Sequence, residues 1–208
     1  MGFISTLLNF LGCSVQTNKK DKKLSKDTQD QISKSIEDFK NRSIHKELTA
    51  QIIDTTSDDN LLQVVFDNLS EQQPTDYKKE YQTVMTWNKP QQAIYMIWLL
   101  EAEVNNGGYN QFYFNSSGQF YKHLPDVLKL VGADKFADLT KRANDIYEKE
   151  NSKITKHQDG TLECFSKSYD DNPLNKFDDE FYKLYDIENL QQIQVDFIRK
   201  HKTEFIDK

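Results

Sequence analysis

Residues 101–118, with the sequence EAEVNNGGYNQFYFNSSG, contain the side chains of this chain that most resemble a reactive site. Two carboxylates, Glu101 and Glu103, stand among several side-chain amides, and paired carboxylates are typical of general acid–base catalysis. On a helix, however, residues i and i+2 point about 200° apart, so these carboxylates do not face one site. An enzyme with a pocket at Glu101, Glu103 and Asn105 is therefore the least favoured of three functional hypotheses.

Other signatures of catalysis or ligand binding are missing from the sequence. There is no Gly-rich phosphate loop, no nucleophile elbow and no His-Glu metal helix. The four histidines are scattered with no ligand spacing: His45, His123, His157 and His201. Cys13 and Cys164 lie far apart, which favours a reducing, cytoplasmic location over a disulfide or zinc framework. The sequence therefore predicts no catalytic residue, no metal site and no cofactor.

A structural interpretation accounts for residues 101–118 better. The pair Gly107-Gly108 follows an apolar helix, which predicts a helix end with one of the two glycines in a left-handed conformation. The aromatic residues at 109–114 should then pack the next turn on the core, and Ser116 or Ser117 should cap the following helix. The residues that we assign to this structural motif are Glu101, Glu103, Asn105, Asn106, Gly107, Gly108, Gln111, Phe112, Asn115 and Gly118.

The elements around this motif are expected to be helices. Only 7 glycines and 4 prolines occur, and the apolar material includes 13 Phe and 10 Tyr, so long helices with short connections are favoured. Apolar residues at helical spacing predict helices over 32–39, 58–73, 77–87, 90–100, 120–131, 134–149, 174–185 and 187–205. Pro125 implies a kink or a late start. The polar stretch 151–171 should be irregular, with a short strand pair near 162–165. The predicted class is all-α, an irregular helical bundle.

The N-terminal part differs from the rest. Apolar residues at 3–11 predict a short amphipathic helix over 1–13 that docks on the body or on a partner, with contact to a membrane surface as the second interpretation. A lysine-rich linker is expected over 14–30 and an acidic helical domain over 31–208. No run of about 18 apolar residues is present, so no membrane-spanning helix is predicted.

Charge is unevenly distributed along the chain. Residues 1–48 hold nine Lys/Arg and six Asp/Glu, whereas residues 49–208 hold 18 basic and 27 acidic side chains. The body should therefore repel nucleic acid and attract basic surfaces, so direct binding to nucleic acid is not expected.

The motif at 101–118 resembles the signature of a bacterial family of undefined function that includes a DNA-mimic protein from Neisseria. Segment 131–139 (VGADKFADL) and the segments FDDEFYKL and FIRKHKTEF are similar to the same family, so the resemblance covers about 58–205. It implies a mostly helical fold. From one member it also implies a dimeric acidic decoy that occupies the DNA-binding face of a transcription factor. Residues 1–50 lie outside the resemblance.

A DNA mimic needs carboxylates spaced like backbone phosphates, and neighbours at i and i+4 on a helix lie about 6 Å apart. The candidate partner-binding residues are Asp54, Asp58, Asp59, Asp67, Glu71, Asp170, Asp171, Asp178, Asp179, Glu180, Asp186 and Glu188. Interleaved lysines weaken this field. The leading hypothesis is an acidic, non-catalytic module that blocks a basic partner. In this hypothesis the module mimics DNA and occupies the DNA-binding face of a regulator. The alternative is an immunity or antitoxin protein that neutralises a toxin. A homodimer is compatible with both.

Overall fold

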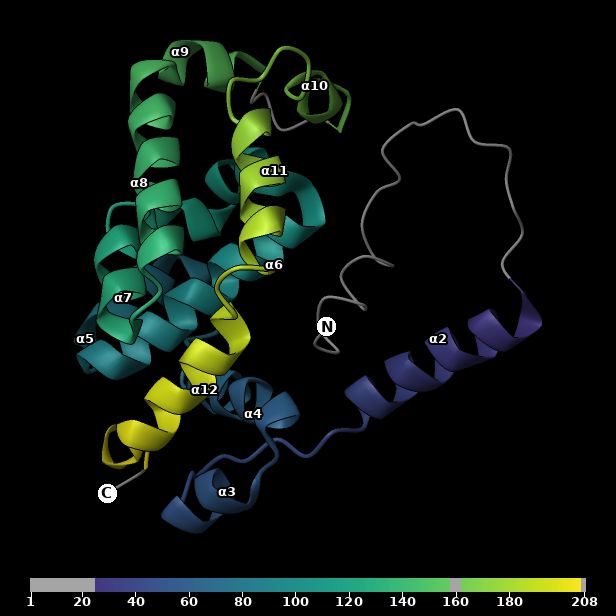
Figure 1. Ribbon diagram of the computed structural model, residues 1–208, viewed down its shortest axis with the longest axis vertical. Coiled ribbons are helices and arrows are strands. Elements are labelled where there is room, and N and C mark those ends of the chain that lie inside the picture. The colour runs from purple at the N-terminus through teal and green to yellow at the C-terminus, as the bar shows by residue number, and fades with distance from the viewer. Residues whose placement is uncertain (1–24, 158–161, 207–208) are drawn as a thin grey trace.

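The computed structural model describes residues 25–157 and 162–206, and every regular element within these ranges is a helix (Figure 1). The α-helices are α2 (Lys26–Lys40), α3 (Ala50–Thr55), α4 (Asp58–Glu71), α5 (Glu80–Thr86), α6 (Lys89–Phe114), α7 (Leu124–Val131), α8 (Asp134–Lys149), α9 (Asn151–Ile154), α10 (Leu162–Lys167), α11 (Asn175–Leu184) and α12 (Leu190–Lys200). Four 3₁₀ helices connect them: η1 (Tyr77–Lys79), η2 (Ser116–Phe120), η3 (Thr155–His157) and η4 (Lys202–Glu204). The all-α prediction is confirmed.

Helix α6 forms the centre of the body. It begins with a capping box, in which Asn88 and Gln91 each bind the other's backbone N–H, and Pro90 stands in its first turn. Most of its residues between 92 and 100 are buried, and α4, α7 and α11 pack against it. Although α6 has 26 residues, no helix among the described residues is long and apolar enough to cross a membrane.

The helices after α6 pack around it much as the periodicity predicts. Helix α7 starts late, with Pro125 in its first turn, and ends at Gly132, which has the left-handed φ of 95°. Helix α8 packs on α7, and α11 packs on both α6 and α8. Helix α12 lies against α4 and α7. The predicted helix over 187–205 is shorter than expected, because Asn189 caps α12 just before Leu190 and the chain continues after Lys200 as η4.

Two expectations about irregular segments are wrong. Residues 26–30 belong to α2 rather than to a linker, because Ser25 accepts a hydrogen bond from the Thr28 N–H at 3.2 Å and caps the helix. The described part of 151–171 contains α9, η3 and α10, and no strand pair near 162–165. There an ion pair of 2.7 Å joins Glu163 and Lys167, which are four residues apart, and such a pair favours a helical turn. The expected helix over 1–13 and the segment 14–24 lie outside the described residues.

Candidate functional site

The Gly107-Gly108 pair interrupts α6 with a kink that divides it into two helical segments. Gly107 has φ −151° and ψ 27°, Gly108 has φ 71° and ψ −177°, and helical structure resumes up to Phe114. The predicted helix stop is present as an interruption of α6, but neither glycine adopts the left-handed cap conformation, because the φ of Gly108 is positive while its ψ is extended, a combination open essentially to glycine alone. The helix resumes because Tyr109 and Phe112 are fully buried and hold the next turn in the core.

Side chains from distant residues satisfy the backbone groups at this kink. The Tyr109 N–H donates to Asp178 Oδ1 at 2.8 Å, and the Tyr182 hydroxyl donates to the Val104 carbonyl at 2.8 Å. The Tyr169 hydroxyl donates to the Gly107 carbonyl at 2.9 Å. Buried backbone groups need such partners, so the kink depends on α11 and on the turn before it.

The Asp178 carboxylate fills the space beside Gly108. A Cβ atom at Gly108 would lie 2.2 Å from Asp178 Oδ2, which is too close for any side chain. Burial raises the pKa of Asp178 to about 6; the Tyr109 N–H lowers this pKa and the neighbouring charge of Asp179 raises it. The Asp178 carboxylate therefore stabilises the kink in α6 more than it adds charge to the protein surface.

Glu101 joins three helices through its carboxylate. It accepts hydrogen bonds of 2.7 Å from the hydroxyl of Tyr185, the residue that follows α11, and from Gln194 Nε2 of α12. The Tyr185 hydroxyl also accepts a bond of 3.3 Å from Asn105 Nδ2. Burial raises the pKa of Glu101, and the two hydrogen bonds to its carboxylate oppose that rise.

Glu103 belongs to a separate network. It accepts bonds from Gln111 Nε2 at 2.7 Å, from Asn115 Nδ2 at 2.8 Å and from the Ser117 hydroxyl at 3.0 Å. The Ser117 hydroxyl thus binds Glu103. Neither Ser116 nor Ser117 caps the next helix, so that prediction is wrong. The two glutamates point to different partners, as their spacing indicates, and do not form the shared pocket that the enzymatic hypothesis requires.

Of the three remaining motif residues, Phe112 and Gly118 have structural positions. Phe112 is fully buried, and a Cβ atom on Gly118 would lie 2.9 Å from the Phe112 carbonyl oxygen. Asn106 is exposed. The motif thus holds α6 to α11, α12 and η2.

Six of the twelve candidate partner-binding carboxylates are engaged within the fold. They are Asp54 with Lys202, Asp58 with Arg199, Asp67 with Arg42, Glu180 with Arg142, Asp178 with the Tyr109 N–H, and Glu188 with the N–H groups of Lys135 and Phe136. Asp67 is the most committed of them, because its side chain is only 7% exposed and accepts two bonds from one guanidinium, of 2.6 and 2.8 Å.

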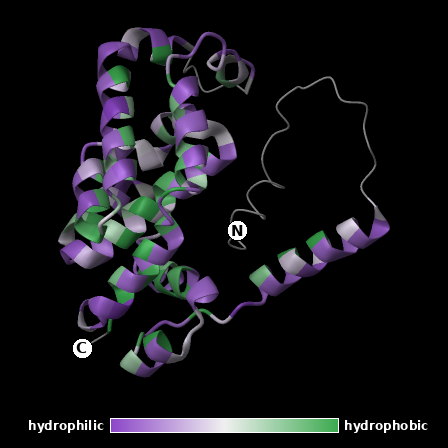
Figure 2. Cartoon of the chain, in the orientation of Figure 1, coloured by the Kyte–Doolittle hydropathy of each residue, from purple (hydrophilic) through white to green (hydrophobic). Residues whose placement is uncertain are grey.

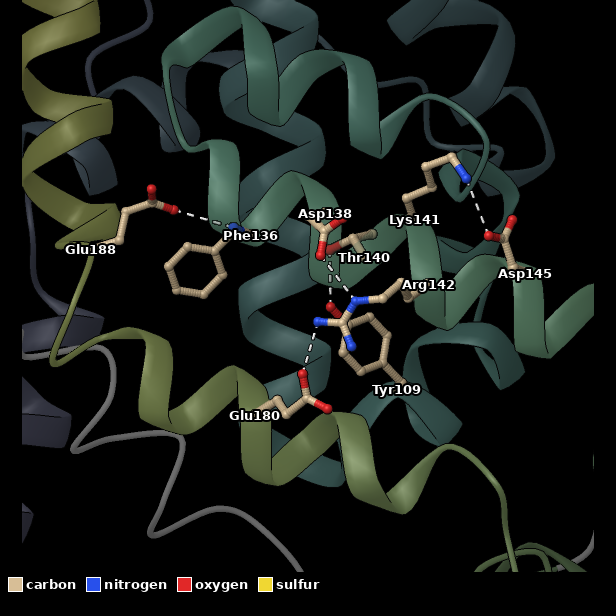
Figure 3. A network of polar contacts seen from close by, with 9 residues as sticks. All are labelled: Tyr109, Phe136, Asp138, Thr140, Lys141, Arg142, Asp145, Glu180 and Glu188. Atoms are coloured by element: carbon tan, nitrogen blue, oxygen red, sulfur yellow. Dashed lines mark hydrogen bonds and ion pairs between the residues drawn. The ribbon is translucent and has the colours of Figure 1, made fainter.

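Figure 3 shows how two of these carboxylates connect α8 with neighbouring elements. Arg142 of α8 binds Asp138 at 2.9 Å and Glu180 of α11 at 2.8 Å. Glu188 accepts the Phe136 N–H at 3.2 Å, at the start of α8. Both carboxylates are therefore partly neutralised by contacts inside the protein.

The other six carboxylates are exposed and have no hydrogen-bond or ion-pair partner among the described residues: Asp59, Glu71, Asp170, Asp171, Asp179 and Asp186. The last four lie on α11 or in the turns at its two ends, and we call them the α11 acidic surface. Residues 168–189 contain seven acidic side chains and two lysines, a net charge of −5 in a chain whose total is −6. Asp179 lies on α11, and Asp186 lies in the turn that follows it.

The sequence of this chain matches the model of a known protein family. Residues 85–201 match the family model described as DMP19-like protein, a match over more than half of the chain. The chain belongs to the DMP19-like family. The matched segment contains the kink in α6, Asp178 and the whole α11 acidic surface, whereas α2, α3 and α4 precede it. No curated protein and no solved structure matches this DMP19-like chain.

Sequence reasoning missed the tyrosines of this site. Tyr182 is 44% exposed and lies between Asp179 and Asp186 along the chain, yet its hydroxyl is bound to the kink. An exposed aromatic residue spaced three and four positions from two acidic residues is the signal that could have identified it. The partners of Tyr169 and Asp178 lie more than sixty positions away, so no local pattern indicates them.

Proposed function

We propose that this protein is an acidic, non-catalytic binding module that blocks a basic partner by placing the α11 acidic surface on the partner's DNA-binding face. The observation that carries the proposal is the concentration of charge: residues 168–189 hold a net −5, and four of their carboxylates remain exposed and unpaired among the described residues. Membership of the DMP19-like family is compatible with a DNA-mimic role. The separate networks of Glu101 and Glu103 support the non-catalytic part.

The negative charge of the α11 acidic surface is less dense than that of a DNA duplex. The ten residues of α11 span about 15 Å, and a duplex of that length carries about nine phosphate charges. A net charge of −5 over α11 and its flanking turns is sparser than that, so binding should also use apolar contact. The exposed ring of Tyr182, between Asp179 and Asp186, is suited to this because tyrosine is enriched in protein interfaces.

Affinity capture tests the proposal. The immobilised full chain is exposed to an extract of its native host at roughly 50 mM and roughly 500 mM salt, since the higher salt screens exposed charges beyond about 4 Å. Wild type is compared with a variant in which Asp170, Asp171, Asp179 and Asp186 are all changed to Asn. A control variant of equal charge has D59N, E71Q, D126N and E204Q, four exposed carboxylates from other elements.

We expect wild type and the control to capture a basic DNA-binding protein at low salt only, and the α11 variant to lose it. Capture by all three proteins, or capture that is indifferent to salt, would contradict the proposal. A basic toxin in place of a DNA-binding regulator would support the immunity or antitoxin alternative instead.

A further inference from the structure

Helix α2 carries one apolar face that the core of the body does not cover. It has no fully buried residue, and its apolar side chains lie outside the hydrophobic core of the described residues. In Figure 2 hydrophobic and hydrophilic positions alternate along α2, which stands apart from the rest of the described fold. Five residues of α2 are half-buried and the other ten are exposed. The half-buried residues follow one stripe about 100° wide, which we call the α2 stripe: Thr28, Ile32, Ser35, Ile36 and Phe39.

Arg42 fixes the C-terminal end of α2 to the body. Its guanidinium donates to both carboxylate oxygens of Asp67 on α4, and it lies 3.8 Å from the centre of the Phe39 ring. One face of this ring is therefore covered, whereas the stripe from Thr28 to Ile36 lies outside the hydrophobic core of the described residues. A single helix of this length is marginally stable in water, so this part of the stripe needs a surface to pack against.

The chemistry of the α2 stripe restricts what can cover it. All the charged residues of α2 lie on its other faces: Lys26, Asp27, Asp30, Lys34, Glu37, Asp38 and Lys40. These three lysines and four acidic residues give a net charge of −1. The helix therefore lacks the cationic border that is typical of helices lying on a membrane surface. The occupant that fits the stripe is an apolar segment without charge.

The chain contains such a segment shortly before α2. Residues 1–18 include no charged side chain. The apolar residues among them recur at helical spacing: Phe3, Ile4, Leu7, Leu8 and Leu11. A helix over residues 3–11 is about 12 Å long from its first to its last residue, the same length as the stripe from Thr28 to Ile36. The two apolar faces thus match in length and in their lack of charge.

The connection between the two faces is long enough for them to meet. Residues 12–24 can span at most about 45 Å, whereas the whole of α2 is about 22 Å long. Every part of the α2 stripe is therefore within reach of residues 3–11. A short tether also gives the segment an effective concentration in the mM range, which favours it over any separate molecule.

We propose that residues 3–11 pack as a helix on the α2 stripe of the same chain, so that the two helices form a hairpin beside the body. The contact removes Ile32 and Ile36 from water and supplies the surface that α2 lacks. The hairpin precedes residues 85–201, which match the family model, and contains no residue of the α11 acidic surface. The inference therefore goes beyond the proposed function and does not rest on it.

Hydrogen exchange of the backbone amides of α2, measured on the full chain, tests this hairpin. Leu8→Asp places a charge on the apolar side of residues 3–11, and Ile36→Asp places one in the stripe. Each variant should speed the exchange of the α2 amides by at least about tenfold and leave α6 and α8 unchanged. Asn9→Asp and Ser33→Asp, which place the same charge on the polar sides of the two segments, are the matched controls and should exchange as wild type does.

The same measurement distinguishes the other occupants of the stripe. Protection of α2 in wild type should be equal at low and high protein concentration, and unlabelled wild type should not restore it to labelled L8D. Protection that rises with concentration, or that is restored in this mixture, would assign the stripe to a second copy and overturn the proposal. Protection that needs vesicles of anionic phospholipid would assign it to a membrane surface and also overturn it. Unchanged exchange of α2 in L8D would do the same.

Discussion

Asp178 is a largely buried carboxylate that no cation contacts among the residues that the structure describes. It accepts one hydrogen bond, from the Tyr109 N–H, and Asp179 is its neighbour along the chain. Its pKa of about 6 lies above the usual value for Asp, 3.8, so the folded protein binds this proton more tightly than the unfolded chain does. The stability contributed by this group is therefore complete below about pH 4 and is lost as the pH rises through 6.

The variant Asp178→Asn should not lose stability as the pH rises through 6. The Asn Oδ1 can still accept the Tyr109 N–H, while the buried charge is absent. At pH 7 the variant should be more stable than wild type by up to about 3 kcal/mol, and near pH 4 the two should differ little. Urea unfolding at several pH values measures the difference. A D178N protein that is less stable than wild type at pH 7 would contradict this account of the kink.

Gly108 should be the glycine least tolerant of substitution. Gly108→Ala forces an alanine into a positive φ with extended ψ and places its Cβ against the Asp178 carboxylate, so we expect a loss of at least about 2 kcal/mol. Gly132→Ala is the control, because Gly132 also has positive φ but nothing lies within 4 Å of its Cβ position. It should cost about 1 kcal/mol. Equal losses in thermal unfolding would show that the contact with Asp178 does not matter.

Among the elements, α8 depends on a cap that comes from far along the chain. The residue before the helix is Ala133, which has no side-chain oxygen, and Glu188 accepts the free N–H groups of Lys135 and Phe136 instead. We expect Glu188→Ala to destabilise the protein by about 1 kcal/mol. Asp186→Ala, a nearby exposed residue without a partner among the described residues, should change stability by less than about 0.5 kcal/mol. Chemical denaturation of both variants checks this, and a similar loss in both would refute the capping role.

The sequence predicts the helices well where one apolar face is continuous. The bounds of α8, Asp134–Lys149, are the predicted ones, and the late start of α7 follows from Pro125 alone. The prediction fails over 151–171, where polar residues dilute the apolar pattern and short helices form through local pairs such as Glu163–Lys167. It does not predict the second helical segment of α6 after Gly108, because the side chains that bind the kink come from α11 and from the turn before it.

The same limit applies to the candidate site. The sequence identifies every acidic residue, but only the fold shows which of them are available to a partner. Asp67 forms an ion pair with Arg42, whereas Asp171 is exposed and unpaired among the described residues. The pairs involved are far apart in sequence: Arg42 is 25 positions from Asp67, and Arg199 is 141 from Asp58. Spacing along one helix carries no information about such pairs.

At the scale of the whole molecule, negative charge is concentrated on one segment. Most ion pairs described here neutralise acidic residues elsewhere, between α4 and the end of α2, between α3 and η4, and between α4 and α12. The residues 168–189 keep a net −5 and four exposed, unpaired carboxylates within the described part of the chain. The field around the protein should therefore be one-sided, which favours fast, salt-sensitive association with a basic surface.

Displacement of DNA tests the central claim most directly. The basic DNA-binding protein captured by the full chain is bound to a fluorescent duplex, and the anisotropy of the duplex is followed as wild type is added. We expect the anisotropy to fall to the value of free DNA, and the variant with Asn at positions 170, 171, 179 and 186 to require at least about tenfold more protein. A rise in anisotropy, from a ternary complex with DNA, would contradict the claim, as would equal displacement by both proteins.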